Sequence, residues 1–330
     1  MTGAGEDWRP TATRERLQLR ATLLQRARAF FAARRVLEVD TPALVNAAVT
    51  DAHLHSVAVD VTGGVPVAGV APPVLYLHTS PEYAMKRLLA AGVGDIYQIC
   101  HVARGFEQSR VHNTEFTLIE WYRLGFDLFL LMDEVESLVR VLCDTHPALA
   151  LPAQRLTYRE AFGRHAGLDP LTATLAQLQD VVQPLGYRGT ASRDELLDLI
   201  MGALIGPRLG QEALTFIYGY PASQAALARL DPADPRIAQR FELYLGGLEL
   251  ANGFHELASA VEQRARFAAD LRVREGSGLP VHGMDERLLA ALEHGLPECA
   301  GVAVGFDRVV MLAAGAGHIR DVLPFPTETA

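Results

Sequence analysis

Apolar residues near the amino terminus recur at intervals of three and four positions. Between Arg14 and Arg35 they are Leu17, Leu19, Leu23, Leu24, Ala27, Phe30 and Phe31. Arginine fills most of the opposite face, so the period predicts an amphipathic helix over 14–35. The segment VLEVDTPAL (36–44) then alternates polar and apolar positions until Pro42, which predicts a short strand ending at a rigid turn.

Strand-like runs and one helix start follow. The runs HSVAVDVT and VLYLHT flank a region rich in Gly and Pro, which predicts two strands and a turn. In TSPE (79–82), Ser80 is the expected helix cap and Pro81 the first helical residue. The expected buried stripe of this helix is Met85, Leu88 and Leu89. IYQICHVA (96–103) and FTLIEWYRL (116–124), joined by a polar loop, predict a β-hairpin.

The remaining pattern completes one α+β chain. Residues 127–143 and 158–205 have a helical period, whereas FELYLGGLELANGF and GVAVGFDRVVML predict strands and a final helix. There is no repeat and no Ser/Gly linker. We therefore expect a single α+β domain over 1–330, an antiparallel sheet flanked by helices, with a helical insertion at about 150–210.

Composition narrows the chemistry. The 330 residues carry a net charge of −9 and are 49% hydrophobic, which indicates a globular protein without a broad basic face for nucleic acid. Lys86 is the single lysine beside 29 arginines, so a P-loop is excluded and a Schiff base would need Lys86. The three cysteines form no C-x-x-C, and neither an apolar leader nor a span of about 18 apolar residues is present. We expect a cytoplasmic protein that does not bind membranes.

Three features carry candidate chemistry: an arginine in the hairpin loop, two glutamates around an Asn-Gly pair, and a Gly-rich strand that leads into Asp-Arg. Arg104 and Arg308 would suit opposite ends of a triphosphate, because a guanidinium binds phosphate in a bidentate manner. Glu249 and Glu256 would hold Mg²⁺, which prefers carboxylate oxygens. Taken singly, each feature also fits a solvated charge or a packing glycine.

In this order the segments resemble the motifs of class II aminoacyl-tRNA synthetases. VLEVDTPAL is similar to motif 1, ARGFEQSRVHNTEFTLIEWY (103–122) to motif 2 and GVAVGFDRVVML (301–312) to motif 3, while ELANGFHEL (249–257) resembles the lysyl type. The motif 1 helix begins within the first twenty residues, so we expect no amino-terminal OB-fold anticodon-binding domain. SPEYAMKRLL, ELANGFHEL and PASQAALA resemble the stand-alone family of elongation factor P lysine ligases.

The resemblance implies an activity and a set of partners. A member of this ligase family activates lysine or (R)-β-lysine with ATP and Mg²⁺ as an aminoacyl adenylate. It then transfers the aminoacyl group to a lysine side chain of elongation factor P. The resemblance also implies a homodimer built through motif 1 and no use of tRNA. Two alternatives remain: a minimal synthetase that charges tRNA, and a non-catalytic regulator that binds ATP or an amino acid.

Site residues follow from the motif positions alone. Arg104 is implied at the α-phosphate and Arg308 at the γ-phosphate, as the catalytic pair. The implied ATP-binding residues are Arg104, Gly105, Phe106, Glu107, Asn113, Glu249, Leu250, Gly305 and Arg308. The implied amino-acid-binding residues are Ser80, Pro81, Glu82, Glu120, Tyr122, Glu256 and Ala303.

Departures from the family pattern concern single residues. Phe106 stands where motif 2 has the glutamate that fixes adenine, so either Glu107 replaces it through a loop shift or nucleotide binding is weaker. Ala303 replaces a motif 3 glycine and would reshape the amino-acid pocket. Glu82 and Lys86 also fit a surface i, i+4 pair, so the expected role of Lys86 is structural.

Overall fold

The structure is a computed structural model that describes residues 8–61, 74–189 and 191–330. The turn expected between the first two strand-like runs falls mostly in 62–73 and lies outside the described residues. The chain divides into two compact units. Unit 1 comprises Met1–Leu124, Ala258–Glu298 and Gly305–Ala330, and unit 2 comprises Gly125–Leu257 and Cys299–Val304. Each unit is described by itself.

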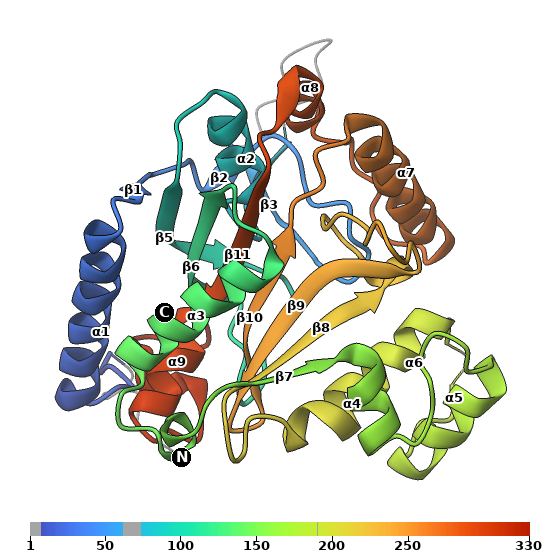
Figure 1. The fold of residues 1–330 in the computed structure, drawn as a ribbon. Helices are drawn as coiled ribbons and strands as arrows, with labels where there is room; N and C mark the ends of the chain where they lie inside the picture. Colours follow the sequence, from blue (N-terminus) through green and yellow to red (C-terminus); the bar gives the residue numbers. More distant parts are fainter. Residues whose placement is uncertain (1–7, 62–73, 190) are drawn as a thin grey trace. The chain divides into compact units, whose positions relative to one another are not determined.

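Unit 1 contains the elements that resemble motifs 1 and 2 and the helix of motif 3 (Figure 1). Its helices are α1 (Arg14–Ala33), α2 (Glu82–Ala90), α7 (Ala260–Gly276), α8 (Glu286–Gly295) and α9 (Phe306–Ala313). Its strands are β1 (Leu37–Glu38), β2 (Leu44–Val45), β3 (Val57–Asp60), β4 (Val74–Leu77), β5 (Ile96–Ala103) and β6 (Glu115–Leu124). β5 pairs with β1 in parallel and with β6 antiparallel, while β2, β4 and β3 form a small antiparallel sheet.

The predicted first helix is confirmed as α1, and its apolar stripe explains its position. Leu23, Ala27 and Phe30 are buried. Phe31 stacks on Tyr97 of β5 with ring centroids 4.3 Å apart and meets Trp121 of β6 edge-on at 5.2 Å. Contacts among large rings of this kind contribute beyond simple area burial. Motif 1 is thereby anchored to the hairpin that carries motif 2.

Two details of the second helix differ from the prediction. α2 begins at Glu82, so Pro81 occupies the capping position and not the first helical one. Ser80 still acts near the helix start, because its Oγ accepts a hydrogen bond from the Glu82 N–H at 3.0 Å. The buried residues are Met85, Lys86 and Leu89, so Lys86 takes the place expected for Leu88.

Unit 2 consists of five sheet strands and four α-helices in the described residues. Its strands are β7 (Gln154–Thr157), β8 (Thr215–Pro221), β9 (Ile237–Leu245), β10 (Leu248–His255) and β11 (Cys299–Gly305). Its helices are α3 (Leu128–Leu142), α4 (Tyr158–His165), α5 (Leu175–Val182) and α6 (Arg193–Ile200). The strand order is β11-β10-β9-β8-β7, antiparallel except for the parallel pair β7 and β8. The expected fold class, an α+β protein with antiparallel strands flanked by helices, is confirmed.

The helices expected over 158–205 are α4, α5 and α6, followed by a π-helical turn at Met201–Ile205. All three begin with a capping box, in which a Thr or Ser side chain and a Glu or Gln three residues later satisfy each other's backbone N–H groups. Their apolar faces enclose a core that contains Tyr158, Phe162 and Leu197, next to β7 and β8 (Figure 1). That they form an insertion into one catalytic domain stays a prediction.

Two features shape the β9–β10 hairpin. Gly246 and Gly247 form its two-residue loop with φ of 59° and 76°, values that favour glycine. The register then shifts: Glu249 lies opposite Tyr244, whereas Ala251 lies opposite Leu243, so Leu250 is the extra residue of a β-bulge. Because of the bulge, every β10 side chain after Leu250 points to the face opposite to the one that strict alternation would give.

Candidate active site

A buried carboxylate network forms in unit 1 around Glu120, a residue implied to bind the amino acid. Glu120 is only 2% exposed. Ser80 Oγ donates to Glu120 Oε2 at 2.7 Å, and Tyr122 OH donates to Glu120 Oε1 at 2.7 Å. Trp121 points to the other face of β6, toward α1, as strand alternation requires. Three of the predicted substrate residues are thus brought into direct contact.

Glu82 extends this network. Its N–H bonds Ser80 Oγ, and its Oε1 lies 2.7 Å from Lys86 Nζ. The Lys86 side chain is 1% exposed and the Glu82 side chain 15% exposed. The i, i+4 pair therefore exists, but the interpretation as a surface pair is wrong, because Lys86 lies on the buried side of α2.

Arg104 lies at the base of the motif 2 loop and is held on two sides. Its Nε donates to Thr79 O at 3.3 Å, and its guanidinium lies 5.0 Å from the centre of the Phe116 ring. The backbone around it is pinned as well, because Arg104 N–H bonds Thr114 O at 2.9 Å and Gly105 N–H bonds His55 O at 2.7 Å. These contacts hold an arginine ready to contact an anion.

Phe106 and Glu107 point in different directions from this loop. Phe106 is 91% exposed, has a φ of 64° and meets the His55 ring edge-on at 5.1 Å. The carboxylate of Glu107 instead approaches the Arg104 guanidinium at 3.9 Å. The left-handed backbone turns Phe106 outward, whereas the replacement of the motif 2 glutamate by Glu107 stays a prediction.

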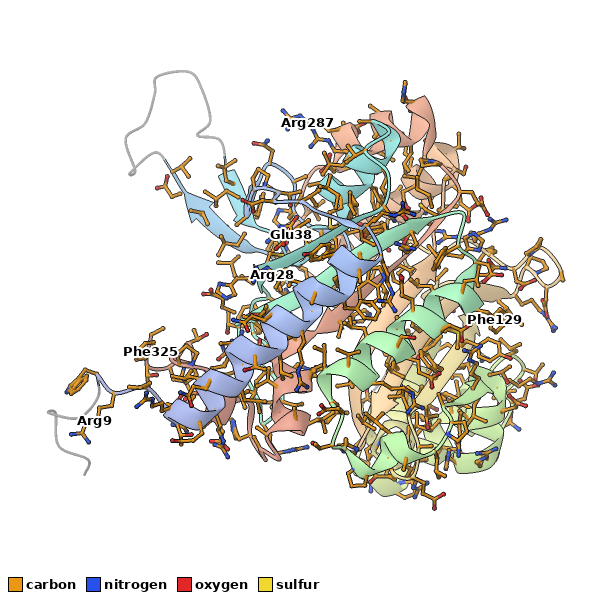
Figure 2. All side chains as sticks on the ribbon, turned by 60° about the vertical axis from the view of Figure 1, so that its left-hand side comes forward. Arg9, Arg28, Glu38, Phe129, Arg287 and Phe325 are labelled. Carbon is orange, nitrogen blue, oxygen red and sulfur yellow. The ribbon has the colours of Figure 1, made fainter. Side chains whose placement is uncertain are left out.

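Replacement of Phe106 by glycine is expected to leave the free energy of unfolding unchanged or to raise it by up to about 1 kcal/mol. The exposed ring buries little surface, and glycine adopts positive φ without the cost that a Cβ imposes. Phe129 is the matched control, an exposed phenylalanine in α3 (Figure 2). Phe129→Gly should destabilise by about 1 kcal/mol. Equal losses in urea unfolding would contradict the interpretation.

Arg308 meets the same loop from α9. Its Nη2 lies 2.7 Å from His112 Nε2, and its Nε donates to Val111 O at 3.3 Å. The other ring nitrogen of His112 lies 2.8 Å from Ser109 Oγ. Burial, together with the charges of Arg308 and Arg104, lowers the pKa of His112 to about 4. His112 is therefore neutral at ordinary pH and accepts a hydrogen bond from Arg308.

The low pKa of His112 predicts a pH effect on stability. Because this pKa lies below the ordinary value of 6.5, the unfolded chain binds the proton more readily than the folded one. The contribution of His112 is fully present above about pH 6.5 and is lost as the pH falls toward 4. Wild type should therefore lose more stability than His112→Gln over this range, as measured by urea unfolding at each pH. Parallel profiles would contradict the assignment.

The motif resemblance implies that Asn113 binds ATP, but in the structure its side chain forms hydrogen bonds within the protein. It is 4% exposed, its Nδ2 donates to Glu115 O at 2.6 Å, and its Oδ1 accepts from the Thr327 N–H at 3.2 Å. The carboxy-terminal segment is bound to the loop a second time, because Ile319 N–H donates to Arg110 O at 2.9 Å. The last residues of the chain therefore help to shape the motif 2 loop.

Asp307 is a structural residue that sequence reasoning missed. It is 2% exposed, forms an ion pair with Arg20 of α1, and accepts from the Thr117 N–H at 2.7 Å. Arg20 also donates to Thr117 Oγ1 at 2.7 Å. Adjacent helix residues point to different sides, so Asp307 serves the core while Arg308 faces the loop. The only sequence signal was the Asp-Arg pair itself.

The bulge at Leu250 decides which residues share a face in unit 2. Side chains directly opposite each other in antiparallel strands point to the same side. Glu249 is opposite Tyr244, and Asn252 is opposite both Glu242 and Ala303. Tyr244 and Glu242 are bonded through the tyrosine OH at 2.6 Å, which confirms that they share a face. Glu249 and Glu256 are seven residues apart, so strict alternation would point their side chains to opposite faces. Because of the bulge, they point to the same face.

The expectation that Glu249 and Glu256 hold one magnesium ion together stays a prediction. The bulge at Leu250 places both residues on one face of the strand. Glu242 shares this face, diagonal to Glu249. Among the described residues no group of three or more acidic, His or Cys side chains forms a metal site. Glu256 is 4% exposed, and its N–H bonds Cys299 O.

The antiparallel strands, the arginine-bearing hairpin loop and the Gly-rich strand leading into α9 define the catalytic fold of a class II synthetase. The sequence matches the family of class II tRNA synthetases of the D, K and N type over residues 6–329. The chain therefore belongs to this family.

Three similar proteins carry the name elongation factor P–(R)-β-lysine ligase. The ligase of Vibrio cholerae is 50% identical over 330 residues, 98% of this chain and 99% of the relative. Those of Vibrio vulnificus and Edwardsiella ictaluri are 48% and 47% identical, with 98% of this chain and 99% and 98% of the relatives covered. These proteins are similar to the chain over nearly its full length.

Proposed function

We propose that this protein is an ATP-dependent ligase that activates lysine or (R)-β-lysine and transfers it to a lysine side chain of elongation factor P. The observation that carries the proposal is the buried carboxylate network of Ser80, Glu120 and Tyr122, to which Glu82 is joined. A diamino acid brings two ammonium groups, and buried ammonium groups need such carboxylates. Relatives of about 50% identity bear the name of this activity.

The reaction has two steps. In the first, a carboxylate oxygen of the amino acid attacks the α-phosphorus of ATP, and the bond to the β-phosphate oxygen breaks, so that pyrophosphate leaves. In the second, a neutral amine of the acceptor attacks the carbonyl carbon, AMP leaves, and the amine loses a proton. Charge neutralisation and positioning dominate the first step, and for this we assign Arg104 to the α-phosphate and Arg308 to the γ-phosphate.

The proposed ATP-binding residues are Arg104, Gly105, Phe106, Glu107, Asn113, Glu249, Leu250, Gly305 and Arg308. Glu249 and Glu256 would hold Mg²⁺, because carboxylate oxygens are the ligands that it prefers. When bound, the ion offsets negative charge on the triphosphate. Glu242 lies on the same face as Glu249, and Arg240, which lies 2.5 Å from Glu242 Oε1, and Tyr244 orient its carboxylate.

The amino acid contacts are assigned likewise. The proposed residues are Ser80, Pro81, Glu82, Glu120, Tyr122, Glu256 and Ala303. Burial favours Glu120 and Glu256 as partners of the substrate's ammonium groups, since both are nearly inaccessible to water. Ala303 lies opposite Asn252 on the face that carries Glu249, so its methyl group belongs to the polar side of the sheet.

A homodimer, a cytoplasmic location and independence from tRNA complete the proposal. The α1 helix, which we assign to the dimer interface, carries Arg28 on its exposed side, paired with Glu38 (Figure 2). Over the described ranges, none of the helices combines the length and apolar character needed to cross a bilayer.

The test is ATP–pyrophosphate exchange followed by transfer. Exchange should require lysine or (R)-β-lysine, and radiolabelled amino acid should pass to purified elongation factor P and not to total tRNA. Mass spectrometry should find the added mass on one lysine of the factor. Background exchange with both amino acids would reject the proposal, and label in tRNA would favour the minimal synthetase instead.

A further inference from the structure

The single lysine of the chain lies in the interior. Lys86 is 1% exposed and shares the buried side of α2 with Met85 and Leu89. Its Nζ lies 2.7 Å from Glu82 Oε1, one helical turn earlier. An ammonium group in such a place costs several kcal/mol unless it is paired, so an exchange for a leucine or methionine would be the simpler way to fill the core. The retained charge calls for a reason other than packing.

Lys86 is connected to the carboxylate network through Glu82. Ser80 Oγ accepts from the Glu82 N–H at 3.0 Å and donates to Glu120 Oε2 at 2.7 Å. Lys86, Glu82, Ser80, Glu120 and Tyr122 therefore form one continuous chain of contacts within unit 1. Such charge-assisted contacts fix orientation as well as energy. A change at Lys86 would release the carboxylate of Glu82 from this arrangement.

The same contacts pair opposite charges. The Lys86 ammonium group lies 2.7 Å from Glu82 Oε1, and the Lys86 side chain is 1% exposed, so water weakens this ion pair little. Lys86 thus holds the Glu82 carboxylate in its orientation.

We propose that Lys86 is a positioning residue that orients Glu82 to receive an ammonium group of the amino-acid substrate. This inference rests on the proposed function and deepens it. It also replaces the expectation that Lys86 serves stability alone.

The test is a double-mutant cycle with wild type, Lys86→Met, Glu82→Gln and the combined variant. ATP–pyrophosphate exchange gives KM separately for the amino acid and for ATP. Lys86→Met should raise the amino-acid KM about tenfold or more and change the ATP KM less than about twofold, since one charge-assisted contact is lost. In the Glu82→Gln background the same substitution should have little further effect. Because KM does not depend on the amount of folded enzyme, partial misfolding does not obscure the comparison.

Two controls accompany the cycle. Arg87→Met removes an exposed cation from the same helix and should leave both KM values unchanged. Lys86→Arg keeps the charge and should restore the amino-acid KM to within about threefold of wild type. If Lys86→Met yields no folded protein, Lys86→Gln takes its place in the cycle.

Two outcomes would overturn the inference. One is an equal effect of the Lys86 substitution with and without the Glu82 carboxylate. The other is a lower melting temperature with both KM values unchanged, which would leave Lys86 a purely structural residue. A wild-type enzyme without exchange activity would instead reject the proposed function, so the two failures are distinguishable.

Discussion

Replacement of Arg104 by alanine is expected to lower kcat for ATP–pyrophosphate exchange by about 10²–10³-fold, the loss typical of removing a single preorganised charge-stabilising donor. The reason is that negative charge on the α-phosphate grows as the amino-acid carboxylate attacks. A guanidinium held by Thr79 and Phe116 needs no reorganisation to meet it. Exchange kinetics at saturating ATP and amino acid measure the effect.

The control for Arg104 is Arg28→Ala on α1. This arginine is half exposed, and its ion pair with Glu38 is of a kind worth about 0–1 kcal/mol (Figure 2). It should retain kcat. Arg104→Lys tests the geometry, because an ammonium group cannot replace the planar fork, and its activity should stay well below wild type. Near-normal kcat in Arg104→Ala would remove Arg104 from the chemical step.

Replacement of Asp307 by alanine is expected to lower the free energy of unfolding by about 3–5 kcal/mol, the cost of breaking a buried ion pair. The substitution leaves the Arg20 guanidinium and the Thr117 N–H without their shared acceptor. Since these groups lie on α1, β6 and α9, the loss should weaken all three motif-bearing elements together. Urea unfolding followed by circular dichroism provides the measurement.

Asp321→Ala is the matched control, because Asp321 also pairs with an arginine of α1. The Arg16–Asp321 distance is 3.7 Å, and both side chains are about one-third exposed, so the expected loss is below about 1 kcal/mol. Similar losses in the two variants would show that the Asp307 pair contributes no more than a surface contact.

Elements with a local period could be predicted from the sequence. The stripe of α1 repeats every three to four residues, and β5 and β6 are continuous strand-like runs that pair residue for residue. Helix α7 illustrates what such reasoning misses. Its buried residues are Gln263, Phe267 and Arg274, so the face that packs inward has no apolar period to detect. Strand β7 was not predicted for a different reason: its four residues are too few to show alternation.

The candidate site was predictable as a set of residues but not as a geometry. Motif spacing brought Ser80, Glu120 and Tyr122 into one hypothesis, and the structure places them in contact. The faces of β10 were not predictable by counting, because counting assumes strict alternation and the bulge at Leu250 changes its phase. The burial of the Glu82–Lys86 pair also could not be predicted from the sequence. Nothing in a lysine four residues after a glutamate shows that the pair lies inside the protein.

The interior position of the only lysine has a practical consequence for work with this protein. Reagents that acylate side-chain amines, and proteases that cut after lysine, find no accessible target in the folded described chain, because Lys86 is 1% exposed. In a mixture with a protein substrate rich in lysine, such reagents would report on the substrate alone. Amine labelling could then follow the occupancy of an acceptor lysine over time without first separating the enzyme.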